Sequence, residues 1–179
     1  MKKALSILLT LVLIMLSGCS GRTSYSGIEY SDENYFDSMI SDTVGFRLVT
    51  GSPAATQMSK VWQKTQDGGK TWTDVKDIST DVKNYPVDVV CWSETEGLIL
   101  TDYHSVREYI YLTSDGGNTW TGIYVGEDAD IYTNGVSAEY DADKDMITVK
   151  VAVKDEEDKD DYAQRTYVSY DHGVSWKLK

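Results

Sequence analysis

The sequence predicts an all-β, propeller-type fold built from four-stranded antiparallel units, and three observations lead to this prediction. An eight-residue pattern, Ser/Thr-x-Asp-x-Gly-x-Ser/Thr-Trp, occurs three times along the chain. Short segments that alternate apolar and polar residues, as half-buried strands do, separate the three copies. The composition also favours strands, because the chain has 13 Tyr and 5 Trp but only 2 Pro. A supersecondary unit repeated at this spacing indicates a repeat architecture.

Each position of the repeated pattern has an expected structural role. The aspartate accepts hydrogen bonds from backbone N–H groups of its own tight turn, and the hydroxyls tie the flanking strands to that turn. The glycine suits a positive φ, and the tryptophan buries a large ring. We therefore interpret the three boxes as structural hairpin turns and expect no catalytic residue in them. The box residues are Thr65, Asp67, Gly69, Thr71 and Trp72, then Thr113, Asp115, Gly117, Thr119 and Trp120, then Ser169, Asp171, Gly173, Ser175 and Trp176.

Each box joins two strands of a four-stranded unit, and three such blades cover residues 29–78, 79–128 and 129–179. The box aspartates lie 48 and 56 residues apart, against about 40–50 residues for propeller repeats, so the third repeat carries an insertion at 155–161. The strands expected in the three units are Tyr35–Ser41, Gly45–Thr50, Lys60–Thr65 and Thr71–Val75, then Val87–Ser93, Gly97–Thr101, Tyr109–Thr113 and Thr119–Val125, then Gly135–Tyr140, Met146–Val153, Arg165–Ser169 and Ser175–Leu178.

The first 18 residues are predicted to be a secretory signal peptide. Two lysines precede an apolar run, Ala4–Leu16, which is shorter than the about 20 residues that span a bilayer. The run ends in Leu16-Ser17-Gly18-Cys19, which resembles the lipobox of bacterial lipoproteins. This resemblance implies cleavage before Cys19 and attachment of diacylglycerol to its thiol. Residues 19–28 would then be the lipidated cysteine and a flexible tether, and residues 29–179 a folded domain outside the cytoplasm, held on the membrane by acyl chains.

The repeated pattern itself resembles the Asp box, or BNR repeat, of bacterial sialidases, other propeller glycosidases and photosystem II assembly factor-like propellers. The resemblance to the last class is strongest, since Asp42-Thr-Val-Gly45-Phe46 before Asp67-Gly-Gly-Lys-Thr-Trp72 follows its layout. It implies boxes at the blade periphery, away from a central site, and carries no shared chemistry. Closed propellers have four to eight blades. The three units therefore predict either an open partial propeller or a homodimer that closes a six-bladed ring.

Charge and cysteine content narrow the possible partners. The formal net charge is −12, and removal of a signal peptide with two lysines and no acidic residue makes it −14. Such an acidic chain disfavours nucleic acid as a partner and favours either cationic partners or simple solubility. Once Cys19 is lipidated, Cys91 remains without an intramolecular disulfide partner, and we interpret it as a small buried side chain.

Several residues are candidate reactive groups, and each of them also has a structural interpretation. Arg47, Arg107 and Arg165 match the number in a sialidase arginine triad, but no nucleophile and acid pair is identifiable. Asp141-Ala-Asp143-Lys-Asp145 alternates aspartates as a calcium loop does, yet lacks the later glycine and glutamate, and we interpret it as a polar turn. The acidic run 155–161 is expected to be a solvated loop. His104 and His172 have no metal-site spacing, and His172 is expected to be exposed.

The function that this pattern favours is a lipid-anchored, non-enzymatic interaction module that binds a protein or another envelope component. No cofactor and no metal are expected. The alternative is carbohydrate recognition by a protein related to sialidase-like glycosidases. The sequence names no ligand.

Overall fold

The computed structural model describes residues 35–51, 58–102, 106–126, 132–154 and 162–179. Within these ranges the chain forms twelve strands and no helix, and so no helix long and apolar enough to cross a bilayer. The strands are β1 (Tyr35–Met39), β2 (Gly45–Thr50), β3 (Lys60–Thr65), β4 (Thr73–Asp77), β5 (Tyr85–Cys91), β6 (Gly97–Asp102), β7 (Ile110–Thr113), β8 (Thr121–Ile123), β9 (Tyr132–Asp141), β10 (Met146–Lys154), β11 (Ala163–Ser169) and β12 (Lys177–Leu178).

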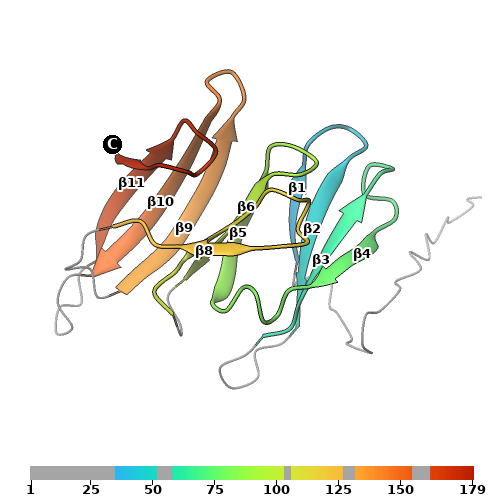
Figure 1. Ribbon diagram of the computed structural model, residues 1–179, viewed down its shortest axis with the longest axis horizontal. Helices are drawn as coiled ribbons and strands as arrows, with labels where there is room; N and C mark the ends of the chain where they lie inside the picture. Colours follow the sequence, from blue (N-terminus) through green and yellow to red (C-terminus); the bar gives the residue numbers. More distant parts are fainter. Residues whose placement is uncertain (1–34, 52–57, 103–105, 127–131, 155–161) are drawn as a thin grey trace, which may run out of the picture.

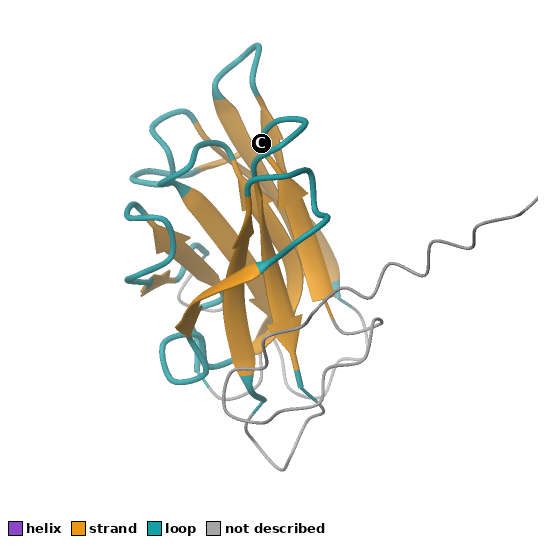
Figure 2. Cartoon of the chain, turned by 90° about the vertical axis from the view of Figure 1, so that its right-hand side faces the viewer, coloured by secondary structure: helices purple, strands orange, loops and turns teal. Residues whose placement is uncertain are grey.

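The strands form three antiparallel four-stranded meanders, β1–β4, β5–β8 and β9–β12. The three sheets stand side by side in chain order, with β9–β12 and β1–β4 at the two ends of the row (Figure 1). Seen from the side, the strands run in similar directions and the turns collect at the sheet ends (Figure 2). The predicted all-β fold of three four-stranded blades is thus confirmed, and we call the sheets the first, second and third blade.

Each of the twelve predicted strands is present, but many bounds differ by one to three residues: β5 begins at Tyr85 rather than Val87, and β9 at Tyr132 rather than Gly135. The fourth strand of each blade differs in a regular way. Strands β4, β8 and β12 begin two residues later than the sequence pattern suggested, at Thr73, Thr121 and Lys177. The reason is local, because the last Ser or Thr of each box is still bonded to the box aspartate and belongs to the turn. The alternation of side chains alone does not reveal where such a turn ends.

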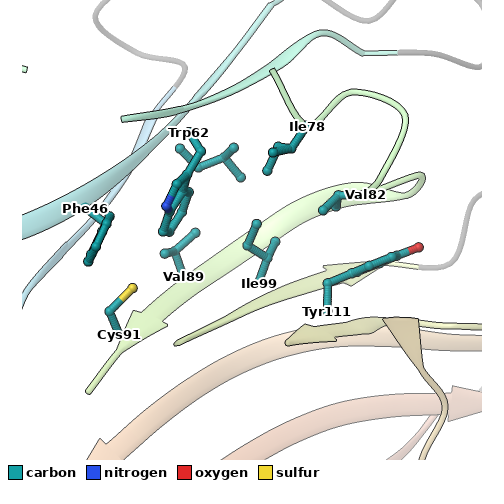
Figure 3. Packing of buried hydrophobic residues seen from close by; sticks show 9 residues of the cluster. Phe46, Trp62, Ile78, Val82, Val89, Cys91, Ile99 and Tyr111 are labelled. Atoms are coloured by element: carbon teal, nitrogen blue, oxygen red, sulfur yellow. The ribbon is translucent and has the colours of Figure 1, made fainter. Parts of the chain in front are cut away.

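Each blade is buried against the next along what we call a seam. The first seam joins the first and second blades, where Phe46 and Trp62 stack with ring centroids 5.2 Å apart and pack against Val89, Ile99 and Tyr111 (Figure 3). The second seam is aliphatic, with the β6 and β7 residues Leu98, Leu100 and Ile110 against the β10 residues Ile147, Val149, Val151 and Val153. These side chains are 0–4% exposed. Burial of this apolar area at two seams is the main stabilisation of the row of blades.

The inner strands of neighbouring blades are also tied by side chains. Strand β5 lies beside both β1 and β9. The backbone N–H of Cys91 on β5 donates to Ser38 Oγ on β1 at 2.7 Å, and the N–H of Ala138 on β9 donates to Asp88 Oδ2 on β5 at 2.8 Å. A side chain from one blade thus satisfies an edge N–H of the next blade, which would otherwise lack a partner in the sheet.

Candidate interaction surface

Each box is organised around its aspartate. In the second box, Asp115 accepts hydrogen bonds from the backbone N–H of Thr119 at 2.9 Å, from its hydroxyl at 2.7 Å and from the Thr113 hydroxyl at 3.0 Å. The same three bonds surround Asp67 and Asp171. Because donors favour the ionised form, the bonds from Thr71 and from Ser175 lower the pKa of Asp67 and of Asp171 to about 2.

This arrangement gives the box aspartates a structural use. At neutral pH each carboxylate is ionised and bonded within its own turn, so it is a poor general acid. The glycines Gly69, Gly117 and Gly173 have φ values of 81°, 93° and 89°, a region that side chains rarely adopt. Each box tryptophan then donates its indole N–H to the carbonyl of its box glycine at 3.0–3.1 Å.

The second and third boxes dock onto the preceding blade. Trp120 of the second box meets Trp62 of the first blade edge to face, with centroids 5.1 Å apart, and Trp62 Nε1 donates to Gly116 O at 3.1 Å. A Cβ on Gly117 would overlap the Trp62 ring. In the third box a Cβ on Gly173 would lie 2.8 Å from Leu112 Cδ1 of the second blade. The box is therefore both a turn and one side of a seam.

No blade precedes the first box within the described residues, and a cation occupies the equivalent position. The Arg47 guanidinium lies 4.2 Å from the Trp72 ring centroid and 3.9 Å from that of Tyr35, so it stacks with both rings. Arg47 Nε and Nη2 donate to the two oxygens of Asp37 at 2.6 and 2.7 Å. Met39 continues this surface and is 44% exposed. We call Tyr35, Asp37, Met39, Arg47 and Trp72 the first free face.

Strand register shows why the first free face differs from a seam. Arg47 pairs with Gln63, Ile99 with Tyr111 and Val149 with Tyr167, so these pairs occupy equivalent places in the three blades. Ile99 and Tyr111 face the first seam, while Val149 and Tyr167 face the second. The first blade has no neighbouring blade on this side in the described part of the chain, and it carries a cation and an amide instead. A polar outer face is what a terminal repeat requires.

The opposite end of the row is polar in a different way. The pairs Thr148–Val168 and Lys150–Thr166 of the third blade occupy the places of Leu98–Leu112 and Leu100–Ile110 in the second blade. We call these four residues, Thr148, Lys150, Thr166 and Val168, the third free face. Large aliphatic side chains bury the second seam, whereas the third free face offers hydroxyls, one small apolar side chain and an exposed lysine. Of these four residues Lys150 is exposed and Thr166 half-buried, whereas Thr148 and Val168 are each 6% exposed.

The three arginines considered for a sialidase triad do not converge. Arg47 lies on the first free face. Arg107 stacks 4.0 Å from the Tyr124 ring centroid in the second blade. Arg165 pairs with Val151 on the side of the third blade that faces the second. The second blade therefore lies between Arg47 and Arg165, and no single carboxylate of a substrate can meet all three cations.

The remaining candidates have structural partners or lie outside the described ranges. Burial raises the pKa of the Cys91 thiol to about 12, so this side chain is not a nucleophile. Asp141 closes the β9–β10 hairpin by accepting bonds from the N–H groups of Asp143 and Lys144. Among the described residues, no three His, Cys, Asp or Glu side chains form a metal-binding group. Cys19, His104 and the run 155–161 lie outside the described residues.

No family model and no curated protein matches the chain. Among solved structures, the chain is similar to a protein described as "YCF48 bound to D1 peptide". The two share 11% sequence identity over 81% of this chain and 80% of that chain, with a TM-score of 0.33.

Two features of the surface were not anticipated from the sequence. The stacking of Arg47 between Tyr35 and Trp72 joins residues from β1, β2 and the first box, and no local pattern signals it. His172 was expected to be exposed, but its side chain is 35% exposed and contacts Glu96 and Asp145. The sequence does single out His172, because it stands where the other two boxes have glycine.

Proposed function

We propose that the mature chain is a non-enzymatic interaction module, held on the outer side of a bacterial membrane by lipid on Cys19, and that it binds a protein through the first free face. The lipobox resemblance at Leu16–Cys19 supports the anchor. The binding surface is supported by one observation: the first free face holds a fixed stack of Tyr, Arg and Trp at an end of the row of blades.

The chemistry of that face supports a protein as the partner. Tyr, Trp, Arg and Met are enriched at protein interfaces, and Tyr, Trp and Arg supply most energetic hot spots. The Asp37 carboxylate and two rings hold Arg47 in place, so binding would order few additional side chains. The third free face, with Thr148, Lys150 and Thr166, has the residue types that interfaces use less. The first free face is therefore the better docking surface of the two.

The alternative function, carbohydrate recognition with a weak glycosidase-like site, has less support. Its sequence basis is the Asp-box resemblance to sialidases together with the number of arginines, and the three arginines lie on separate surfaces. A propeller-type fold hosts many functions and does not decide between them. The proposal of a non-enzymatic role rests on this geometry and on the engagement of each box aspartate within its own turn.

Site-specific photo-crosslinking in intact cells tests the proposed surface. A benzophenone amino acid at Met39 places the reactive group on the first free face, and the same substitution at Lys150 places it on the third. We expect ultraviolet light to yield a discrete, heavier adduct from the Met39 position and none from the Lys150 position. Equal adducts at both positions, or none at Met39, would contradict the proposal.

A second variant tests the anchor in the same assay. With Cys19→Ser the chain should leave the membrane fraction, and the Met39 adduct should decline because the partner is met at the membrane. Retention of this variant in the membrane fraction would argue against lipidation at Cys19. If the chain were released and the adduct did not decrease, the partner would not be at the membrane, and the proposed docking surface would still be supported.

A further inference from the structure

The third box differs from the other two at one position on the outside of the turn. His172 has a φ of 54° and stands where Gly68 and Gly116 have φ values of 73° and 74°. A Cβ on Gly68 would lie 2.8 Å from Asp42 O, and one on Gly116 would lie 3.2 Å from Glu94 O. The first two boxes therefore leave little room for a side chain, and the third has admitted an ionisable one in a backbone conformation that costs energy.

The His172 ring connects the second and third blades. Its Nδ1 lies 3.1 Å from Glu96 Oε1, next to the start of β6 in the second blade, and its Nε2 lies 2.9 Å from Asp145 Oδ1 in the β9–β10 hairpin of the third. Asp145 also has a positive φ, 49°. Two residues in an uncommon conformation thus meet within the third blade, and the contact with Glu96 carries this pair across the second seam. The compensating interactions are those of the imidazole with the two carboxylates.

The two contacts require two donors from one ring. A neutral imidazole has a single N–H and a lone pair on its other nitrogen, whereas the imidazolium donates from both nitrogens. With both carboxylates ionised, only the protonated ring forms both bonds, and the neutral ring turns a lone pair toward one carboxylate. The hydrogen bond with Asp145 and the proximity of Glu96 raise the pKa of His172 above its ordinary value of 6.5.

Other charged groups around the contact act on it indirectly. The Tyr140 hydroxyl at the end of β9 donates to Asp145 Oδ1 at 2.7 Å. The same oxygen faces the His172 ring, so it accepts from both groups when the ring is protonated. Asp141 and Lys144 of the same hairpin pair with each other. Asp171, the neighbour of His172 in the box, is bonded within its own turn.

We propose that His172 is a pH-dependent latch across the second seam, closed when the imidazolium binds Glu96 and Asp145 together and weakened when one ring nitrogen loses its proton. The contribution of this contact to the stability of the fold decreases as the pH rises. Because the folded pKa lies above the unfolded value of 6.5, the stabilisation is complete below pH 6.5 and is lost as the pH rises through the folded pKa. The first seam has Gly116 at the equivalent box position and lacks this dependence.

Two backbone amides make the test local to one seam. The Ala138 N–H bonds to Asp88 across the second seam, and the Cys91 N–H bonds to Ser38 across the first. Hydrogen exchange of both amides, corrected for intrinsic rates, is measured by NMR at about pH 6 and about pH 8, on either side of the ordinary histidine pKa. We expect protection of Ala138 to fall several-fold at the higher pH while protection of Cys91 stays constant. Titration of the His172 ring signals in the same samples should give a pKa above 6.5.

Variants separate a latch from a passive contact. His172→Gly restores the residue of the other boxes and should remove the pH dependence at Ala138. Asp145→Asn with Glu96→Gln keeps the ring and should lower the measured pKa of His172. The proposal is overturned if His172 titrates at or below 6.5, if both amides change equally, or if His172→Gly keeps the dependence. None of these measurements involves the first free face, so their failure would leave the proposed function untouched.

Discussion

At the scale of single residues, the box aspartate is the centre of each turn. Asp67 receives two bonds from Thr71 and one from the Thr65 hydroxyl, and none of these donors lies outside the box. Asp67 is only half-buried, so screening by water limits the strength of each bond. The lowered pKa nevertheless shows that the folded turn prefers the ionised form.

Acid should therefore loosen the boxes in a defined pH range. The folded pKa of Asp67 and of Asp171 is about 2, below the ordinary value of 3.8, so their stabilisation is present above pH 3.8 and is lost as the pH falls toward 2. We expect Asp67→Asn and Asp171→Asn to lower Tm at neutral pH and to flatten its decline between these two pH values. Thermal melts followed by circular dichroism measure this.

A matched control for the acid experiment is Asp143→Asn. Asp143 is an exposed aspartate of the β9–β10 hairpin, and its own backbone N–H is the group bonded to Asp141. This variant should melt like the wild type across the same pH range. If all three variants changed Tm alike, general loss of negative charge rather than the box geometry would explain the effect.

At the scale of elements, the same turn serves two purposes that depend on its place in the row. Gly117 lies against Trp62 of the preceding blade. Gly69, at the equivalent place in the first blade, meets only Trp72 of its own box, and the nearest atom would be 3.5 Å from an added Cβ. Both glycines have a positive φ, so they differ in packing and not in backbone conformation.

The pair Gly117→Ala and Gly69→Ala separates these two purposes. Each substitution forces a side chain into a positive φ, at a cost on the order of 1–2 kcal/mol. Gly117→Ala also overpacks the first seam against Trp62, which adds about 1–3 kcal/mol. Urea unfolding should show the larger loss of stability for Gly117→Ala. Equal losses would mean that the box does not pack tightly across the seam.

The strands were predictable from the sequence, whereas the contacts between strands and between blades were not. The twelve strands followed from alternation and box positions, because both are local properties of the chain. The stack of Tyr35, Arg47 and Trp72 was not predictable in this way, since it depends on cross-strand register and on the absence of a preceding blade. The bridge made by His172 depends likewise on which hairpins meet at the second seam.

At the scale of the whole molecule, the ends of the row bear on the predicted six-bladed dimer. Ring closure would press the first free face of one copy against the third free face of the other. Register places Arg47 and Gln63 on one of these faces, and Lys150 and Thr166 on the other, where the internal seams have aliphatic and aromatic residues. Arg47 and Gln63 already bind Asp37 and Asp74, so ring closure would remove Lys150 from water next to a second cation, without a matched partner, and this would oppose association.

We therefore expect the soluble chain that begins at Ser20 to be a monomer, with the mass of one chain by light scattering on a sizing column. The double variant Lys150→Leu with Thr166→Ile gives the third free face the residues of the second blade, Leu100 and Ile110. An exposed apolar sheet face invites association, so this variant should form larger species as concentration rises. A two-chain mass for the unaltered protein would instead support the closed ring, and an unchanged monomeric mass for the variant would mean that polarity at this face is not what keeps the row open.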